Sequence, residues 1–543
     1  MSTARLPSLD GRQFSLFQTE PELSKQAGAH LSAATSGRRF IQGDPTAIFI
    51  GMTPLKKHLN QAGIHSPFVV SELLDAQDWT VFEQRYAPTG RAPYAPRAML
   101  GLILYGIMQG VSSLRALERL ARVDLGAMWV TGGIAPDHAN IGRFICLHET
   151  SLSNDFFETL TRTILEQSRT STAALAGDGT VIEAACSYYK LIKEEAVRAR
   201  VDKAQKQVEQ ASVDQKDKAQ QQLERAKLCE QVFDQRKAAR QRNGKSSESL
   251  AISPTEPDAV VNRQKRGRGF APAYVPSVLA NEARIIVAHG VDPTSENIVV
   301  GELLDQVGRI QSDQNRELLL DSGYFDDGVI SATLERDVSL LCPPKPSTLD
   351  KVNGLYHKNQ FTYDAAQDVY HCPGGQVLVR ISHTKASNRT REQMLYACHA
   401  CTDCPKRSDC TRSLRGRRIK RYPEDELRQA LTKIMEHPKA RAVFNQRKAW
   451  VEPVFSMLRQ QQGLSRFRRK GLAGVQREFA LHVLAYNLAR AVALRLYPFF
   501  WLVIGVLHKM GTIRSSVVGM VLNQGAGSLS SSGRAGLRPV LLN

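Results

Sequence analysis

The chain has 543 residues, and its 72 Lys and Arg against 53 Asp and Glu give a formal net charge of +19. A hydrophobic fraction of 42% is that of an ordinary soluble globular protein, and the length suits roughly two to four domains. The charge balance excludes a chiefly acidic chain and favours a polyanionic partner, either nucleic acid or an anionic membrane surface.

The sequence shows no clear export signal or membrane span. The N-terminus, MSTARLPSLDGRQF, has no apolar core of signal-peptide length. The apolar stretch YPFFWLVIGVLH, at 497–508, is shorter than the roughly 20 residues that a membrane-spanning helix needs, and it predicts a core helix. We therefore expect a cytoplasmic protein with no membrane partner, and membrane anchoring is the lesser alternative.

The first part of the chain predicts a polar arm and then a helical domain. Residues 1–45 are polar with weak periodicity, and residues 46–168 carry a helical pattern. Apolar residues recur at helical spacing in 96–110 and in 113–129, and Ser113 is placed as the N-cap of the second helix. Such a pair can form a helix-turn-helix DNA reader or simply two packed helices, and the second reading is slightly favoured.

Strand patterns begin after this domain. LAGDGTVIEA, at 175–184, predicts a strand that meets a turn. The segment 190–242 is rich in Ala, Gln and charged residues and predicts a long helix or a helical hairpin. A basic linker is predicted at 262–274. The elements predicted to follow are strands at 283–291 and 316–324, a helix at 295–311, a helical region at 424–495 and a disordered tail from about 509.

The chain has nine cysteines, and they are crowded in one segment. Cys398, Cys401, Cys404 and Cys410 form a C-x2-C-x2-C-x5-C run, preceded by Cys372 in HCPGG. Paired C-x2-C turns present thiolates to one tetrahedral zinc ion, but five cysteines for four ligand positions leave one over. A structural zinc and reduced thiols in a small insertion are equal alternatives. The remaining cysteines, predicted to be buried or inert, are Cys146, Cys186, Cys229 and Cys342.

Three acidic residues stand where metal chemistry needs them. Asp178 and Asp321 each end a predicted strand, and Glu452 lies in the predicted helix RKAWVEPVFSMLR. Such a set suits two divalent metal ions, which prefer oxygen ligands and promote phosphodiester cleavage. Lys448 and Arg459 can share a helix face with Glu452, which suits a phosphate-bearing substrate. From spacing alone, a solvated helix face with ion pairs is the more common explanation.

Other acids compete with these three. Glu183 lies close to the first strand and can face the same site. Asp326 and Asp327 stand at a turn that enters a helix, where N-capping explains them. Glu302 and Asp305 are expected on a solvated helix face.

Five segments resemble, in order, the DDE transposases of bacterial insertion sequences. PYAPRAMLGLILYG and APDHANIGRF resemble their helical N-terminal domain. AGDGTVIEA and LLLDSGYFDDGVI resemble the strands that carry the two catalytic aspartates. The last segment resembles their glutamate helix and the region after it, and it reads RKAWVEPVFSMLRQQQGLSRFRRKGLAGVQREFALHVLAYNLAR. The resemblance covers roughly residues 45–495.

The resemblance implies an α/β fold with a ribonuclease H-like catalytic core. A long helical insertion and a small cysteine-bearing insertion would interrupt this core, and an all-α N-terminal domain would precede it. The implied boundaries are an arm at 1–45, a DNA-binding domain at 46–168, a catalytic domain at 169–495 with insertions at 190–255 and 343–425, and an apolar segment and flexible tail at 496–543.

The resemblance also implies residue roles. Asp178, Asp321 and Glu452 become catalytic residues that bind two Mg²⁺ or Mn²⁺ ions. Position 459 has arginine where lysine is more usual, and Phe444 stands where tyrosine is common. The basic residues expected to contact DNA are Arg447, Lys448, Arg459, Arg466, Arg468, Arg469 and Lys470. The zinc ligands that the resemblance selects are Cys372, Cys401, Cys404 and Cys410.

The implied activity is that of a transposase. It would bind the terminal inverted repeats of its own element, cleave each end to expose a 3′-hydroxyl, and join that hydroxyl to target DNA. Its partners would be double-stranded DNA, both transposon ends and target, and a second copy of the chain, in the cytoplasm on the nucleoid. The alternatives are a metal-dependent nuclease that cuts without joining and a transposase-derived DNA-binding protein without activity. A helical scaffold built on 190–242 leaves both strand aspartates unexplained.

Overall fold

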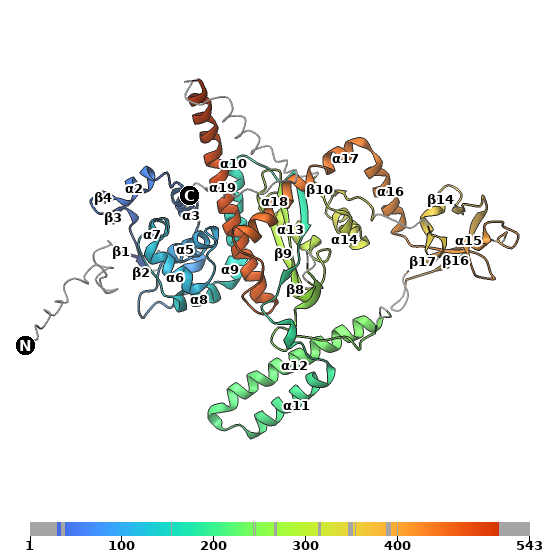
Figure 1. Ribbon diagram of the computed structural model, residues 1–543, viewed down its shortest axis with the longest axis horizontal. Helices are drawn as coiled ribbons and strands as arrows, with labels where there is room; N and C mark the ends of the chain where they lie inside the picture. The colour runs from blue at the N-terminus through green and yellow to red at the C-terminus, as the bar shows by residue number, and fades with distance from the viewer. Residues whose placement is uncertain are drawn as a thin grey trace, which may run out of the picture.

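The protein is a mixed α/β structure. The computed structural model describes residues 30–33, 39–153, 155–242, 244, 246–264, 269–312, 316–345, 351–352, 354–386, 392–398 and 400–509. The predicted tail from about 509 and most of the predicted arm at 1–45 lie outside these residues. Figure 1 shows a helical N-terminal part on one side, a central sheet, a second sheet at the far side, and a helical hairpin projecting from the centre.

Helices form the N-terminal part, as predicted, together with two short β-hairpins. The helices are α2 (Leu55–Gln61), α3 (Ser66–Asp75), α4 (Thr80–Glu83), α5 (Pro96–Met108), α6 (Leu114–Val123), α7 (Leu125–Thr131), α8 (His138–Leu147), α9 (Glu149–Ser153) and α10 (Asp155–Ser168). The hairpins pair β1 (His30–Ala33) with β2 (Arg39–Gln42) and β3 (Phe49–Ile50) with β4 (Thr53–Pro54). Helix α5 is buried along nearly its whole length, because its sequence is apolar on every face.

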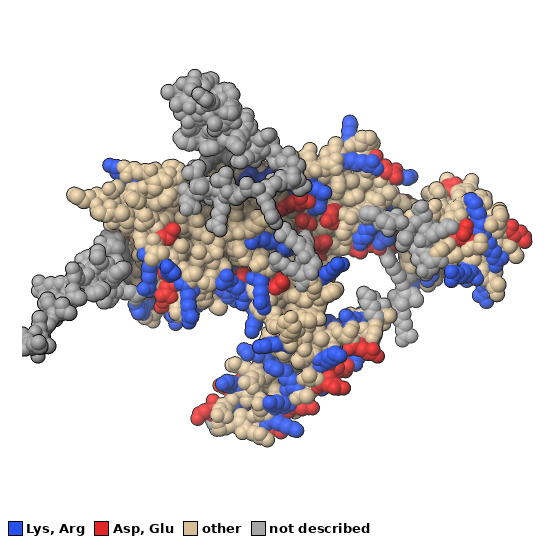
Figure 2. Space-filling model, viewed as in Figure 1, with Lys and Arg blue, Asp and Glu red and all other residues tan. Residues whose placement is uncertain are grey.

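Helix α6 is amphipathic and packs beside α5 and α8. The side chain of Ser113 caps its N-terminus, as predicted. Leu117 and Ala121 are buried on its inner face. The exposed basic residues of the helix are Arg115, Arg119 and Arg122. Lys and Arg side chains gather over this part of the molecule in Figure 2. The two helices are therefore packed together, and α6 turns a basic surface outward.

The central sheet holds the two strands with the predicted aspartates. Its strand order is β11–β10–β5–β8–β6, and β9 and β7 also pair with β8. The strands are β5 (Ala174–Gly179), β6 (Ile182–Glu183), β7 (Val260–Arg263), β8 (Phe270–Asn281), β9 (Ile286–Asp292), β10 (Arg316–Leu319) and β11 (Val338–Leu341). Strands β5, β10 and β11 are parallel, and β8 is antiparallel to β5 and β9. Leu318, Leu319 and Leu320 are fully buried, as a central parallel strand requires.

The prediction of a basic linker at 262–274 is wrong. This segment belongs largely to β7 and β8, which pair with each other, and β8 runs through the middle of the sheet. Pro272 and Pro276 obscure this strand in the sequence, because proline cannot donate to a strand ladder. Their carbonyls accept hydrogen bonds instead, from Ala184 N at 2.8 Å and Thr180 N at 3.0 Å.

Helix α13 (Val300–Ile310) joins β9 to β10 and begins later than the predicted 295–311. The side chain of Asp292 accepts hydrogen bonds from Thr294 N at 2.6 Å and Ser295 N at 2.9 Å. This local turn holds the next residues out of the helix. Glu296 therefore lies in a loop at the edge of the sheet.

The segment 190–242 forms a helical hairpin of α11 (Glu194–Gln210) and α12 (Val213–Arg242), one of the two predicted forms. Arg198 of α11 pairs with Glu230 and Asp234 of α12, and Lys237 Nζ lies 2.8 Å from Glu194. The hairpin is thus held by ion pairs across its two helices as well as by a thin apolar seam.

The cysteine-bearing region forms a second, antiparallel sheet. Its strands follow in chain order as β14 (Thr362–Asp364), β15 (Val369–His371), β16 (Val377–Thr384), β17 (Gln393–Ala397) and β18 (Arg418–Arg421). Before it lie α14 (Asp327–Leu334), β12 (Lys351–Val352) and β13 (Leu355–Tyr356), and α15 (Arg407–Cys410) lies between β17 and β18. A small aromatic and thiol core supports this sheet apart from the main core.

The last described part of the chain is helical, as predicted. Its helices are α16 (Asp425–Glu436), α17 (Pro438–Phe444), α18 (Arg447–Gln460) and α19 (Leu472–Lys509). Helix α19 packs on β9 and α5 and so joins the central sheet to the N-terminal helices. It includes the apolar stretch 497–508, which is helical as predicted. Within the described part of the chain, no helix has the length and apolar content needed to cross a membrane.

Two histidines lie at the contact of α19 with the sheet, His482 buried and His289 half-buried. His289 packs edge-on against Phe157 and Phe479, and burial lowers its pKa to about 4. His482 Nδ1 lies 2.9 Å from the Gln462 side-chain amide, and burial, helped by Arg468, lowers its pKa to about 3. Both rings are therefore neutral in the folded protein at neutral pH.

We expect the protein to lose stability as the pH falls below about 6.5. Below this pH both histidines bind protons in the unfolded chain but stay neutral in the folded chain. The free energy of unfolding therefore falls by roughly 1 kcal/mol per histidine at about pH 5.5. Urea unfolding at pH 7 and pH 5.5 measures this loss. His289→Gln should flatten the pH dependence, whereas His65→Gln, at an exposed position, should not. A pH dependence that His289→Gln leaves unchanged would contradict this account.

Candidate active site

Asp178 and Asp321 come together because their strands are neighbours. The parallel register pairs Leu319 of β10 with Ala176 of β5. Two positions further on, Asp321 and Asp178 lie opposite each other at the carboxyl ends of the two strands. Residues two apart on a strand share a face, so both carboxylates leave the sheet on the same side. Acidic side chains gather near β10 in Figure 2.

The guanidinium of Arg447 lies against both aspartates. Its Nη1 is 3.8 Å from Asp178 Oδ1, and its Nη2 is 3.6 Å from Asp321 Oδ2. Nη1 also donates to the carbonyl of Gly177 at 2.9 Å. The arginine side chain is only 7% exposed, so it is a fixed positive charge that offsets repulsion between the two carboxylates.

Glycines on both sides of Asp178 leave room that a larger residue would fill. A Cβ at Gly177 would lie 2.4 Å from Leu320 Cδ2, inside the packed sheet. A Cβ at Gly179 would lie 2.2 Å from Glu296 Oε2. The first glycine therefore allows β5 to pack against β10, and the second allows the Glu296 carboxylate to approach β5.

Glu296 also approaches the second aspartate. A Cβ at Gly323 would lie 2.9 Å from Asp321 Oδ1 and 3.3 Å from Glu296 Oε1. The sequence does not single out Glu296, because the pattern predicts a helix from residue 295. The available signal is the glycine that follows each aspartate closely, in GDG and DSG, since such glycines mark a close approach of another group.

Glu452 is exposed on α18, which is fixed beside β5 at both ends. Arg447 contacts β5 near the start of the helix. Arg459, near its end, donates to Thr180 Oγ1 and to the carbonyl of Val181, the latter at 2.8 Å. Glu452 and Arg459 are about two turns apart on one edge of the helix. Glu452 therefore shares its helix edge with the arginine that touches the end of β5.

The residue after Glu452 is a proline inside the helix. Pro453 has no N–H to donate to the carbonyl of Ala449, four residues earlier. Arg284 Nε donates to that carbonyl instead, at 3.0 Å. The proline thus frees an acceptor that ties α18 to the turn before β9.

The acidic residues at the carboxyl ends of β5 and β10, here called the catalytic edge, fit a hydrated divalent cation. Their carboxylates are hard oxygen donors, and Gly179 and Gly323 let carboxylate oxygens come close to the strand ends. The buried hydroxyl of Ser277 lies beside Gly179 and interacts with the hydroxyl of Tyr324. Within the described ranges, no three His, Cys, Asp or Glu side chains are already arranged around one ion position.

The competing acids have other partners. Asp326 caps α14, as predicted, by accepting from a backbone N–H at 3.0 Å. The prediction that Asp327 caps this helix as well is wrong, because its carboxylate faces α16 and lies 2.5 Å from Arg428 Nε. Asp305 is paired with Arg336 at 2.7 Å.

The basic residues after α18 differ in what they contact. Arg466 donates to three successive carbonyls that follow β6, so its guanidinium is committed within the protein. Buried Glu478 accepts from the backbone N–H groups of Arg468 and Arg469, at 2.9 and 2.8 Å. Arg468 and Lys470 project from this fixed loop and are exposed, as is Lys448 on α18.

All five clustered cysteines line one small cavity of about 20 Å³. The Cys372 sulfur accepts from Gly374 N and Gln376 N, each at 3.3 Å, and the Cys401 sulfur accepts from Arg417 N at 3.5 Å. Backbone N–H groups therefore point at two of the five sulfurs. Of the isolated cysteines, Cys186, Cys229 and Cys342 are buried as predicted, whereas Cys146 is exposed on α8.

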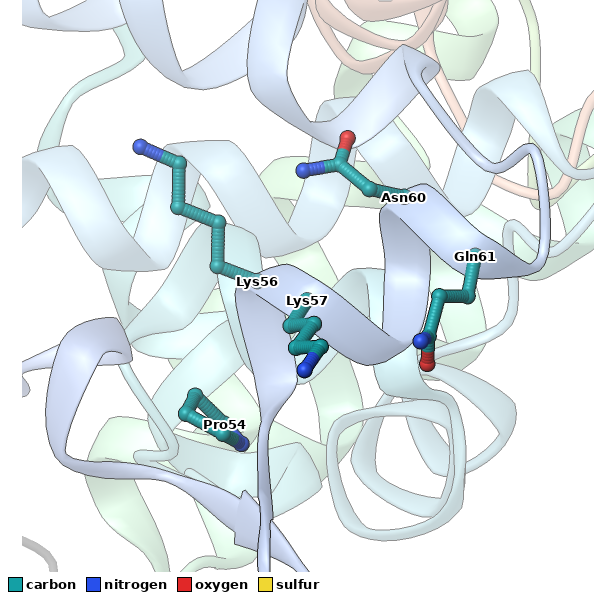
Figure 3. A pocket seen from close by; sticks show the side chains of 5 residues that line it. All are labelled: Pro54, Lys56, Lys57, Asn60 and Gln61. Carbon is teal, nitrogen blue, oxygen red and sulfur yellow. The ribbon is translucent and has the colours of Figure 1, made fainter.

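A separate hollow of about 540 Å³ lies over α2 in the N-terminal part (Figure 3). Its lining residues are Pro54, Lys56, Lys57, Asn60 and Gln61. All belong to one short helix or to the residue before it, so the hollow has a single wall. It offers no converging set of groups for chemistry.

We expect Arg447→Met to destabilise the protein by about 2 kcal/mol when a chelator removes divalent cations. The substitution keeps an unbranched stem but removes the guanidinium that faces two carboxylates and a buried carbonyl. Urea unfolding measures the effect. Lys448→Met, at the next and exposed position, is the matched control and should change little. Equal stability of the two variants would show that Arg447 does not hold the strand ends.

Two families match this chain. The Transposase domain (DUF772) family matches residues 63–146, within the N-terminal helices. The Transposase DDE domain family matches residues 371–492, which include α18 and Glu452 and lie after both aspartates. No curated protein matches the chain. Because two transposase families match in this order along one chain, the matches support a DDE transposase of an insertion sequence.

Proposed function

We propose that the protein binds the terminal inverted repeats of its insertion sequence and catalyses metal-dependent DNA cleavage and strand transfer. The observation that carries this proposal is the position of Asp178 and Asp321 at neighbouring strand ends, with α18 and its Glu452 held beside β5. The family matches support a transposase, and a transposase acts on DNA.

The proposed architecture follows the resemblance. A ribonuclease H-like catalytic domain would span 169–495, and a helical DNA-binding domain would span 46–168. The mixed sheet with both aspartates at adjacent strand ends supports the first assignment. The exposed basic face of α6 supports the second, since cations on one face favour a DNA backbone.

Asp178, Asp321 and Glu452 are the proposed holders of two Mg²⁺ or Mn²⁺ ions. When bound, such ions activate a water molecule and stabilise the leaving oxygen in phosphodiester cleavage. DDE transposase domains use divalent metal ions, and the oxygen donors of this edge suit them. Joining follows when the exposed 3′-hydroxyl attacks a target phosphodiester in line, so that one P–O bond forms as another breaks and no bond to the protein forms.

The basic residues near this edge divide into two proposed roles. Lys448, Arg468 and Lys470 are exposed and would contact DNA phosphates, as would the half-buried Arg469. Arg447, Arg459 and Arg466 already contact protein groups, so we propose that they position the strand ends, the glutamate helix and the basic loop. Because each transposon has two ends, two copies of the chain would act together.

The test is an assay with Mg²⁺ and DNA that carries the ends of the element. Wild type should cleave the ends and form joined products. Asp178→Asn, Asp321→Asn and Glu452→Gln should each lower cleavage at least about a hundredfold, about 2.7 kcal/mol of transition-state stabilisation, while leaving DNA binding intact.

Glu302→Gln, on the exposed face of α13, is the control and should cleave as wild type does. Cleavage without joining would favour the nuclease alternative. Binding without cleavage by wild type would favour the transposase-derived binding protein. Full activity in all three acid variants would refute the assignment of the catalytic residues.

We propose further that Cys372, Cys401, Cys404 and Cys410 hold one structural zinc ion. Their sulfurs share one cavity, and backbone N–H groups approach two of them. The fifth cysteine, Cys398, directly follows β17 and would remain a buried thiol.

Zinc analysis of purified variants tests this set. Wild type should hold about one zinc per chain, and Cys404→Ser should lose most of it, because three thiolates close a structural site poorly. Cys398→Ser should keep its zinc, and so should Cys229→Ser, which lies in the helical hairpin. Loss of zinc in Cys398→Ser but not in Cys404→Ser would overturn the choice of ligands.

A further inference from the structure

The loop between β9 and α13 holds Glu296 against both strand ends. The turn at Asp292 fixes the start of this loop. Asn297 Nδ2 donates to the carbonyl of Gly323 at 3.4 Å, and this hydrogen bond holds the loop near β10. The Glu296 carboxylate thus has a defined place between Gly179 and Gly323.

The Glu296 carboxylate adds negative charge beside the two aspartates. Asp178, Asp321 and Glu296 supply three carboxylates, and Arg447 supplies one guanidinium beside the two aspartates. Among these four groups the carboxylates outnumber the guanidinium by two. Clustered carboxylates repel each other less when a cation is near, so the cluster favours cation uptake.

The pKa of the neighbouring Tyr324 responds to the same three carboxylates. Burial raises the pKa of Tyr324 well above its usual value, and the charges of Glu296, Asp178 and Asp321 raise it further, in that order. Glu296 therefore acts on the same buried hydroxyl as both aspartates.

We infer that Glu296 is a further carboxylate of the catalytic edge, where it helps to bind the divalent cation. The inference rests on the proposed function, because it adds a residue to the same site. Gly179 and Gly323 serve it by leaving the space that its carboxylate occupies. No sequence pattern around Glu296 indicates this role, since only the loop geometry brings it to β5 and β10.

Calorimetric titration of the zinc-loaded full chain with Mn²⁺, without DNA, tests the inference. Glu296→Gln keeps the shape of the side chain and removes its charge, and it should weaken Mn²⁺ binding at least about tenfold. Gly179→Ala keeps the charge but displaces the carboxylate, and it should weaken binding in the same direction, with its fold checked by circular dichroism. Glu302→Gln is the matched control and should bind as wild type does.

Asp321→Asn separates the two levels of the proposal. If Asp321→Asn loses Mn²⁺ binding and Glu296→Gln binds as wild type does, the role of Glu296 is refuted and the proposed function stands. If Asp321→Asn also binds Mn²⁺ as wild type does, the metal site itself is refuted. A tenfold loss in Glu296→Gln that Glu302→Gln does not share supports the inference.

Discussion

The contact of Arg447 with Asp178 and Asp321 is the interaction on which the rest of the site depends. Two carboxylates at adjacent strand ends repel each other, and a buried guanidinium offsets that repulsion at 3.6 and 3.8 Å. The same side chain ties α18 to the backbone of β5. A charge at the start of the glutamate helix therefore fixes both the separation of the aspartates and the position of the helix that follows it.

The chain is basic overall, but acidic and basic side chains gather in different places on it. The exposed cations lie on α6, on α18 and in the loop held by Glu478, where they stay hydrated and can meet phosphates. The carboxylates lie at strand ends, where glycines let them come close to one another. The net charge thus describes the surface that would meet DNA, and the local charge describes the site that would hold metal.

Local sequence patterns predicted those parts of the fold that depend on local forces. The leucine run before Asp321, the cap at Ser113 and the charged hairpin at 190–242 all follow from periodicity and propensity. Strand β8 was not predicted, because Pro272 and Pro276 break the local strand pattern. In the structure, the strands on both sides of β8 supply its pairing. The late start of α13 was not predicted, because the side chain of Asp292 accepts backbone N–H groups that would otherwise begin the helix.

The sequence by itself determined which residue types could do the chemistry: two aspartates after apolar strands, a glutamate in a helix, and cysteines in pairs. Only the tertiary structure decided which groups meet. The register of β5 and β10 set the aspartates opposite each other, and the loop after β9 added Glu296, which no spacing indicates. The physical reason is that register, close approach and burial depend on contacts between segments far apart in the chain, and a linear pattern carries no record of them.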